Sequence, residues 1–119
     1  MISELPMFQI LGAMARHAAE SQKVSATNIA HANQPGYKAA EVESFEQFMA
    51  RAASGTAPEG LMAAFKSEEA NAPAAPNGNT VNLEHELLSS ADAMSQHQLA
   101  LTVYTKSLDL LRTAMGKRS

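Results

Sequence analysis

Four histidines are the side chains in this 119-residue sequence that could bind a metal or transfer a proton. On a helix, a zinc site typically takes two histidines four residues apart, because this spacing puts both imidazoles on one face. The four are His17, His31, His85 and His97, and no two of them are four residues apart. The sequence therefore predicts solvated histidines rather than a metal site, and it gives no reason to expect a cofactor.

The carboxylates also lack the arrangement of an acid–base pair. The sequence has 12 Asp and Glu residues, and close pairs such as Glu84 and Glu86 are two positions apart. Residues two apart on a helix point in different directions, whereas paired catalytic carboxylates must face one substrate. The chain has no glycine-rich phosphate loop, and the absence of cysteine removes thiol nucleophiles and disulfides. We expect a protein that is not an enzyme and has no small-molecule substrate.

Charge and hydropathy narrow the class of protein further. The formal net charge is −3, without the basic patch that binding to nucleic acid requires. The apolar segment between Leu5 and Ala15 is too short to cross a membrane. Glu4 precedes this segment and no basic region does, which does not fit a cleavable signal peptide.

Two long amphipathic helices are predicted, one near each end of the chain. The first runs from about residue 4 to 33, with small and apolar residues three and four apart. The second runs from about 83 to 115, where Asn82 can cap its start and Gly116 its end. The second helix has the strongest apolar stripe in the chain, which we call the predicted seam: Leu87, Ala91, Met94, Leu101, Tyr104, Leu108 and Leu111.

The middle of the chain is poorer in large apolar residues. A short helix is predicted over 44–53, with Phe45, Phe48 and Met49 on one side. We favour packing of this helix on the base of the helical pair, and the alternative is a docking peptide for a partner's groove. Residues 68–80 are dense in Pro, Gly and Asn and are predicted to form a flexible loop.

The predicted fold is all-α, with the long N- and C-terminal helices paired as an antiparallel coiled-coil hairpin. A short helix and a flexible Ala/Pro-rich middle connect them. The chain then divides into a first helix and turn over 1–37, a middle part over 38–80, and a last helix over 81–119.

The stretch SATNIAHANQPGYKA, residues 25–39, ends the first helix. Pro35 and Gly36 form a common turn pair, and they explain why the helix stops. Asn28 is not explained in this way, because an amide inside a helix lowers helix propensity. We expect its side chain to make a hydrogen bond that fixes the register of an interface.

This stretch resembles the N-terminal signature of bacterial flagellar axial proteins, roughly S-x-N-[IL]-A-N-x-[NS]-T-P-G-[YF]-K. His31 and Gln34 depart from the usual Asn and Thr. Near the other end, GNTVNLEHELL is similar to the start of the C-terminal segment of proximal rod proteins in the same family. The matching N-terminal residues, which we call the assembly motif, are Asn28, Ile29, Ala30, Asn33, Pro35, Gly36 and Tyr37.

The resemblance implies a structural subunit of the proximal rod of the flagellar basal body, a hollow shaft that transmits torque. The implied partners are other rod subunits, further copies of the chain in a helical array, the basal-body adaptor at the inner-membrane ring and the flagellar type III export apparatus. The implied location is the periplasmic rod, reached without a cleaved signal peptide. In rod and hook subunits a Phe-x-x-x-apolar motif docks on the export gate, and Phe45 and Met49 have that spacing. The alternatives are another proximal rod subunit and a small helical adaptor or export chaperone.

Overall fold

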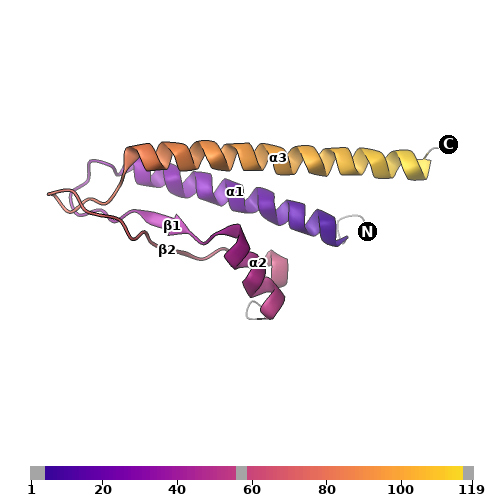
Figure 1. Cartoon of the computed structure of the whole chain (residues 1–119), viewed down its shortest axis with the longest axis horizontal. Coiled ribbons are helices and arrows are strands. Elements are labelled where there is room, and N and C mark those ends of the chain that lie inside the picture. The colour runs from indigo at the N-terminus through magenta and orange to yellow at the C-terminus, as the bar shows by residue number, and fades with distance from the viewer. Residues whose placement is uncertain (1–4, 56–58, 117–119) are drawn as a thin grey trace.

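The computed structural model describes residues 5–55 and 59–116. Two long helices lie side by side and run in opposite directions (Figure 1). The described chain is mostly helical, as predicted, but it also contains a small sheet that was not expected. In chain order the elements are α1 (Pro6–Ala30), β1 (Ala40–Val42), α2 (Phe45–Ser54), the 3-10 helix η2 (Gly60–Met62), β2 (Ser67–Glu69) and α3 (Leu83–Gly116).

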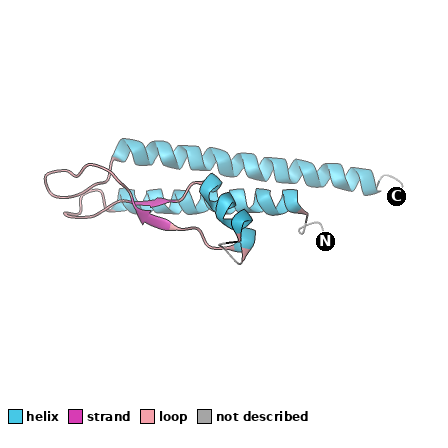
Figure 2. Ribbon diagram, turned by 60° about the horizontal axis from the view of Figure 1, so that its bottom comes forward, coloured by secondary structure: helices cyan, strands magenta, loops and turns pink. Residues whose placement is uncertain are grey.

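The molecule is long and flat, with extents of 67 × 29 × 15 Å. A helix with its side chains is about 10–12 Å across, so the short dimension is little more than one helix. The strands and α2 lie on the α1 side of the helical pair in both views (Figures 1 and 2). Most of the length therefore consists of a single layer of elements, whereas stable domains usually pack two layers around a core.

The contact between α1 and α3 consists largely of small side chains. At one end the rings of Phe8 and Tyr104 meet edge to face, with centroids 5.0 Å apart. Farther along, Ala18 of α1 and Ala93 and Ala100 of α3 are buried. On each long helix one row of buried and half-buried positions has spacings of three and four residues, a spacing that keeps one face of each helix against the other. They are Phe8, Leu11, Ala15, Ala18, Gln22, Ser25 and Ile29 on α1, and Glu86, Ser90, Ala93, His97, Ala100, Tyr104, Ser107 and Leu111 on α3.

The first half of the predicted seam does not face α1, so that prediction was wrong for the single chain. Leu87, Met94 and Leu101 leave 60, 59 and 44% of their surface exposed, and Ala91 is also exposed. The buried row lies one residue earlier, which turns the helix by about 100°. Small residues in that row let the two backbones approach closely. A buried hydrogen bond from Asn28 of α1 to Glu86 fixes the rotation of α3 about its axis. The last three seam residues are half-buried: Tyr104, Leu108 and Leu111.

Helix α2 and its neighbours form a small lobe on α1. The Ser44 side chain accepts from the Gln47 backbone N–H, and the Gln47 side chain accepts from that of Ser44, which makes a capping box. Phe48 is fully buried against Ala13 of α1 and Ala63. The short helix is thereby confirmed, and it packs on α1.

The sheet consists of two antiparallel strands of three residues each, with Glu41 opposite Glu68. The predicted flexible loop over 68–80 therefore begins inside a strand. The first long helix is shorter than the predicted 4–33, and its expected start at Glu4 lies outside the described residues. In the described part of the chain no helix has the length and apolar character needed to cross a membrane.

Candidate assembly site

The chain turns where it leaves α1, and we call the region formed by residues 28–37 and 78–87 the elbow. Asn28 lies at its centre. It is 1% exposed. Its Nδ2 donates to the carbonyl of Ala40 at 2.9 Å and to Oε2 of Glu86 at 3.0 Å. Its Oδ1 accepts from the Ala40 N–H at 3.0 Å and from the Tyr37 hydroxyl at 3.3 Å. The expected hydrogen bond is present, but it joins α1, β1 and α3 of one chain rather than two subunits.

Glu86 brings a negative charge into this site. It is 5% exposed, and its one side-chain hydrogen bond within the described residues is the bond from Asn28. A buried carboxylate is costly unless a donor compensates it. The Asn28 amide therefore compensates the buried Glu86 side chain, and the hydrogen bond between them fixes the position of α3 along α1. Sequence reasoning matched Glu86 to the family pattern without connecting it to Asn28, which is 58 residues away.

Tyr37 and His31 close the elbow from the other side. Their rings stack with centroids 4.5 Å apart and planes 8° from parallel. The His31 Nδ1 is also 2.8 Å from the carbonyl of Thr27, so the ring is held on the last turn of α1. The residue that departs from the family pattern thus has a local role, which is to support the tyrosine that contacts Asn28.

The other residues of the assembly motif do not converge on Asn28. Ile29 is half-buried, while Ala30, Asn33 and Pro35 are exposed around the turn. Gly36 has φ of +76°, a conformation that favours glycine, and its N–H donates to the Asn77 carbonyl at 2.9 Å. The motif therefore combines a buried hydrogen-bonding group with an exposed turn.

The segment before α3 is joined to this turn by hydrogen bonds. Asn79 is buried, and its Nδ2 donates to the carbonyls of His31 and Gln34 at 2.9 and 2.7 Å. The Thr80 hydroxyl oxygen accepts from the Ala39 N–H at 2.8 Å. The two stretches that resemble flagellar axial proteins are thus two halves of one site. Sequence reasoning identified each stretch but missed that Asn79 and Thr80 bind the first.

Replacing Gly78 with alanine is expected to destabilise the elbow. Gly78 has φ of +86°, and a Cβ there would lie 3.3 Å from Cα of Gly36, so the backbones would have to separate. We expect Gly78→Ala to lower the free energy of unfolding by more than about 1 kcal/mol. Gly12→Ala is the matched control, because Gly12 is helical and a Cβ there meets nothing within 4 Å.

Urea unfolding of both variants measures the difference. Gly12→Ala is expected to raise the free energy of unfolding by about 0.5–1 kcal/mol, through higher helix propensity. Equal effects of the two substitutions would show that stability does not depend on the close approach of Gly36 and Gly78.

The two residues with the export-motif spacing lie in the α2 lobe and are not free. Phe45 is half-buried, and its ring centroid is 6.0 Å from that of Phe48 and 5.7 Å from that of His17. Met49 is half-buried too. Docking of this pair on an export gate stays a prediction, and it would require the lobe to open.

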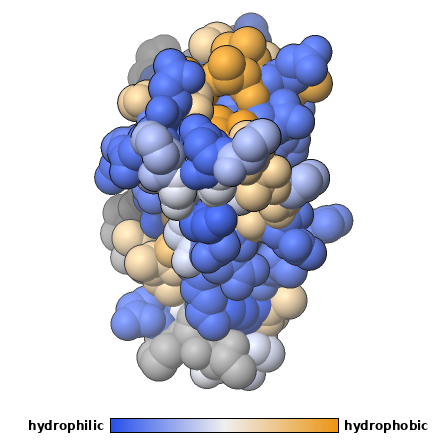
Figure 3. Space-filling model, turned by 90° about the vertical axis from the view of Figure 1, so that its left-hand side faces the viewer, coloured by the Kyte–Doolittle hydropathy of each residue, from blue (hydrophilic) through white to orange (hydrophobic). Residues whose placement is uncertain are grey.

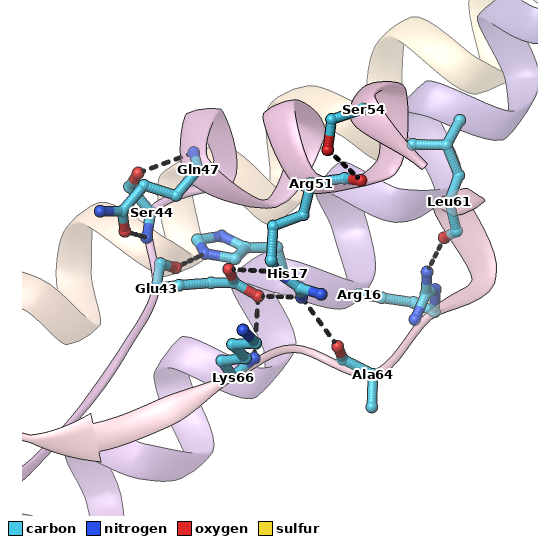
Figure 4. Close-up of polar contacts among 10 residues, drawn as sticks. All are labelled: Arg16, His17, Glu43, Ser44, Gln47, Arg51, Ser54, Leu61, Ala64 and Lys66. Carbon is cyan, nitrogen blue, oxygen red and sulfur yellow. Dashed lines mark hydrogen bonds and ion pairs between the residues drawn. The ribbon is translucent and has the colours of Figure 1, made fainter. Parts of the chain in front are cut away.

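Glu43 links α2, the segment before β2 and α1 through hydrogen bonds (Figure 4). Its carboxylate accepts from Nε and a terminal nitrogen of Arg51 at 3.0 and 2.6 Å and from the Lys66 N–H at 2.8 Å. Its carbonyl lies 2.7 Å from Nε2 of His17 on α1. The hydrogen bonds from Arg51, and then from Lys66, hold the pKa of Glu43 below its ordinary value of 4.5, although burial acts in the opposite direction.

This pKa shift predicts a loss of stability in acid. A carboxyl whose pKa is lower in the folded state stabilises it above the unfolded-state value, and that stabilisation disappears as pH falls through the folded-state pKa. We expect the urea midpoint of the unmodified chain to fall between about pH 6 and about pH 3 by more than that of Glu43→Gln. Identical pH dependence of the two proteins would contradict a role for the ionised carboxylate.

A groove of about 220 Å³ lies where α1, β1 and α3 meet. His17, His85, Glu41, Glu86 and Asp92 contribute to its lining. Within 5–55 and 59–116, no three His, Asp or Glu side chains are placed to hold a metal ion. The groove lies on one side of the contact between the two long helices.

Large apolar side chains are exposed mainly along α3. Seen from the elbow end, apolar surface gathers near the top, over α3, while much of the remaining surface in this view is hydrophilic (Figure 3). Elsewhere in the described chain such residues are Leu5, Met7 and Met62. Those on α3 are Leu83, Leu87, Leu88, Met94, Leu99, Leu101, Val103, Leu110 and Met115.

Comparisons with models of known protein families and with curated proteins give no match for this chain. A function is therefore inferred from the elbow and from the exposed surface of α3. Both features concern how helices are held and what they present to a partner.

Proposed function

We propose that the protein is a structural subunit of the proximal rod of the bacterial flagellar basal body, similar to the rod protein FlgB. The observation that carries the proposal is the elbow. The two stretches that resemble flagellar axial proteins, near residues 28–37 and 78–87, bind each other through Asn28, Glu86 and Asn79. A resemblance at two distant places gains weight when these places form one site.

In this proposal the two long helices form an antiparallel coiled-coil hairpin that contributes to the wall of a hollow shaft. Such an array joins each subunit to several neighbours through different surface patches. The exposed leucines and methionines of α3 supply apolar surface for those contacts, since large apolar patches on a soluble protein usually mark interfaces. The partners are other rod subunits and further copies of the chain.

The proposed location is the periplasmic part of the basal body, next to the adaptor at the inner-membrane ring, after passage through the flagellar type III export apparatus. The N-terminal motif is shared by several rod, hook and junction proteins, so another proximal rod subunit is the alternative within the same class. The pattern before α3 favours the FlgB type.

Introducing a charge on the exposed side of α3 is expected to block assembly. Leu101 is 44% exposed, so Leu101→Asp should keep the fold but disrupt a packed interface with a neighbour. We expect a strain with this variant as its only copy to stop swimming, with the chain missing from isolated basal bodies.

Thr102→Asp is the matched control, because Thr102 is the next residue, exposed, and points about 100° away. It should leave swimming unchanged. Normal swimming of the Leu101→Asp strain, with normal amounts of the chain, would contradict the proposal.

A further inference from the structure

One side of the α1–α3 pair is uncovered and mostly apolar. It is the side opposite the groove, and we call it the open face. On α1 it has small residues: Ala19 and Ala26 are exposed, and a Cβ at Gly12 would meet nothing within 4 Å. On α3 it has large residues. Its members are seven residues apart on each helix: Gly12, Ala19 and Ala26 on α1, and Leu87, Met94, Leu101 and Leu108 on α3.

The register between the helices places small residues level with large ones. Phe8 meets Tyr104 near one end of the pair, and Asn28 meets Glu86 near the other. Interpolation between these contacts puts Ala19 level with Met94. In the same way Gly12 is level with Leu101, and Ala26 with Leu87. On the open face the large residues of α3 therefore form a raised apolar row. The small residues of α1 form a shallow row beside it, over the same length.

A raised row beside a shallow row is complementary to a copy of itself. If two open faces meet and one copy is rotated by half a turn about an axis parallel to the helices, each raised row lies over a shallow row. Direct packing of α3 on α3 would instead place large residues against large ones and leave the shallow rows apart. The flat shape, 15 Å thick, also leaves this side of the helical pair without a second layer.

We propose that two copies of the chain pack through their open faces, with α3 of each copy lying on α1 of the other. The pair is a four-helix bundle in which every α3 runs antiparallel to the α1 that it contacts. Because the axis is parallel to the helices, both copies point the same way. The inference goes beyond the flagellar role and does not depend on it.

The size of the open face is sufficient for such a pair. The row on α3 spans about 22 residues, or about 33 Å at about 1.5 Å per residue, and two helices about 10 Å apart are about 20 Å wide. The face therefore covers about 600 Å² per copy, or about 1,200 Å² in total. This area is at the lower end of the range for specific protein interfaces. We therefore expect a dimer that dissociates on dilution.

Sedimentation of the full chain tests whether the pair forms. At high concentration the mass should approach twice the 12.6 kDa of the chain, and dilution should return it to the single-chain value. Met94→Asp should sediment as a single chain at every concentration, with unchanged helical content by circular dichroism. An unmodified chain that stays single at high concentration would overturn the proposal.

Cysteine cross-linking tests the arrangement, and the chain has no cysteine of its own. A mixture of the single variants Ala19→Cys and Met94→Cys should form a disulfide between the two chains on mild oxidation, since these residues face each other in the pair. Each variant alone should not. A second mixture, Ala26→Cys with Leu87→Cys, should give the same result, because a disulfide requires Cβ atoms about 3.5–4.5 Å apart.

Thr27→Cys mixed with Ser95→Cys is the control, because both residues are exposed and lie off the open face. This mixture should give no cross-link above the level of random collisions. Efficient cross-linking of Met94→Cys with Leu108→Cys, without a cross-link from either predicted mixture, would show α3 against α3 and overturn the assignment. Because these readouts use purified protein, they can fail while the flagellar role holds, and the reverse is also true.

Discussion

Replacing Asn28 with alanine is expected to lower the free energy of unfolding by about 1.5–3 kcal/mol, the range for loss of a hydrogen bond to a charged group. The substitution removes the described donor to the Glu86 side chain, which is 5% exposed. It also removes the side-chain partners of the Ala40 N–H and carbonyl. Urea unfolding followed by circular dichroism measures the loss.

Asn33→Ala is the matched control for this prediction. Asn33 belongs to the same motif and is exposed, and a surface substitution of this kind usually changes stability by less than about 0.5 kcal/mol. Similar losses from Asn28→Ala and Asn33→Ala would mean that the asparagines act through the turn, and that the buried contact with Glu86 contributes little.

Truncation of Phe48 is the second large effect that we expect. Phe48 is 0% exposed, its ring centroid lies 4.5 Å from that of Phe65, and the Arg51 guanidinium carbon is 5.7 Å from its centre. Phe48→Ala leaves a cavity where α2 meets Ala13 of α1 and should cost about 3–5 kcal/mol. Hydrogen exchange should show that α2 loses protection while the middle of α1 and α3 keeps it.

Met62→Ala is the control, since Met62 lies near the same lobe and is 76% exposed. It should leave both stability and exchange close to those of the unmodified chain. If Phe48→Ala unfolds the long helices together with α2, the lobe and the helical pair form one cooperative unit, which contradicts the expected separation.

The helices could be predicted because their pattern is local. Residues three and four apart repeat through α1 and α3, and Ser44 with Gln47 marks the start of α2. The strands could not be predicted in this way. Each has three residues, they lie 25 or more positions apart, and their pairing depends on how α2 folds back. The rotation of α3 also escaped prediction, because a row of Ala and Ser is less conspicuous in a sequence than the leucines beside it.

The candidate site was predictable in part for a similar reason. Asn28 is conspicuous because it is polar inside a helix, and Pro35 with Gly36 marks the turn. The partners of this segment are Glu86, Asn79 and Thr80, which lie 41 to 58 positions from the residues they bind. Spacing within one segment cannot reveal such pairs, because they are set by the tertiary register of the two long helices.

The location of the protein in the cell is the most direct test of the proposed role. Basal bodies can be isolated from the organism that carries the gene, and the chain can be detected in them with a specific antibody. The proposal predicts that the chain is present in the rod and that a strain without the gene assembles no rod and does not swim. A chain absent from basal bodies, with normal swimming of the deletion strain, would contradict it.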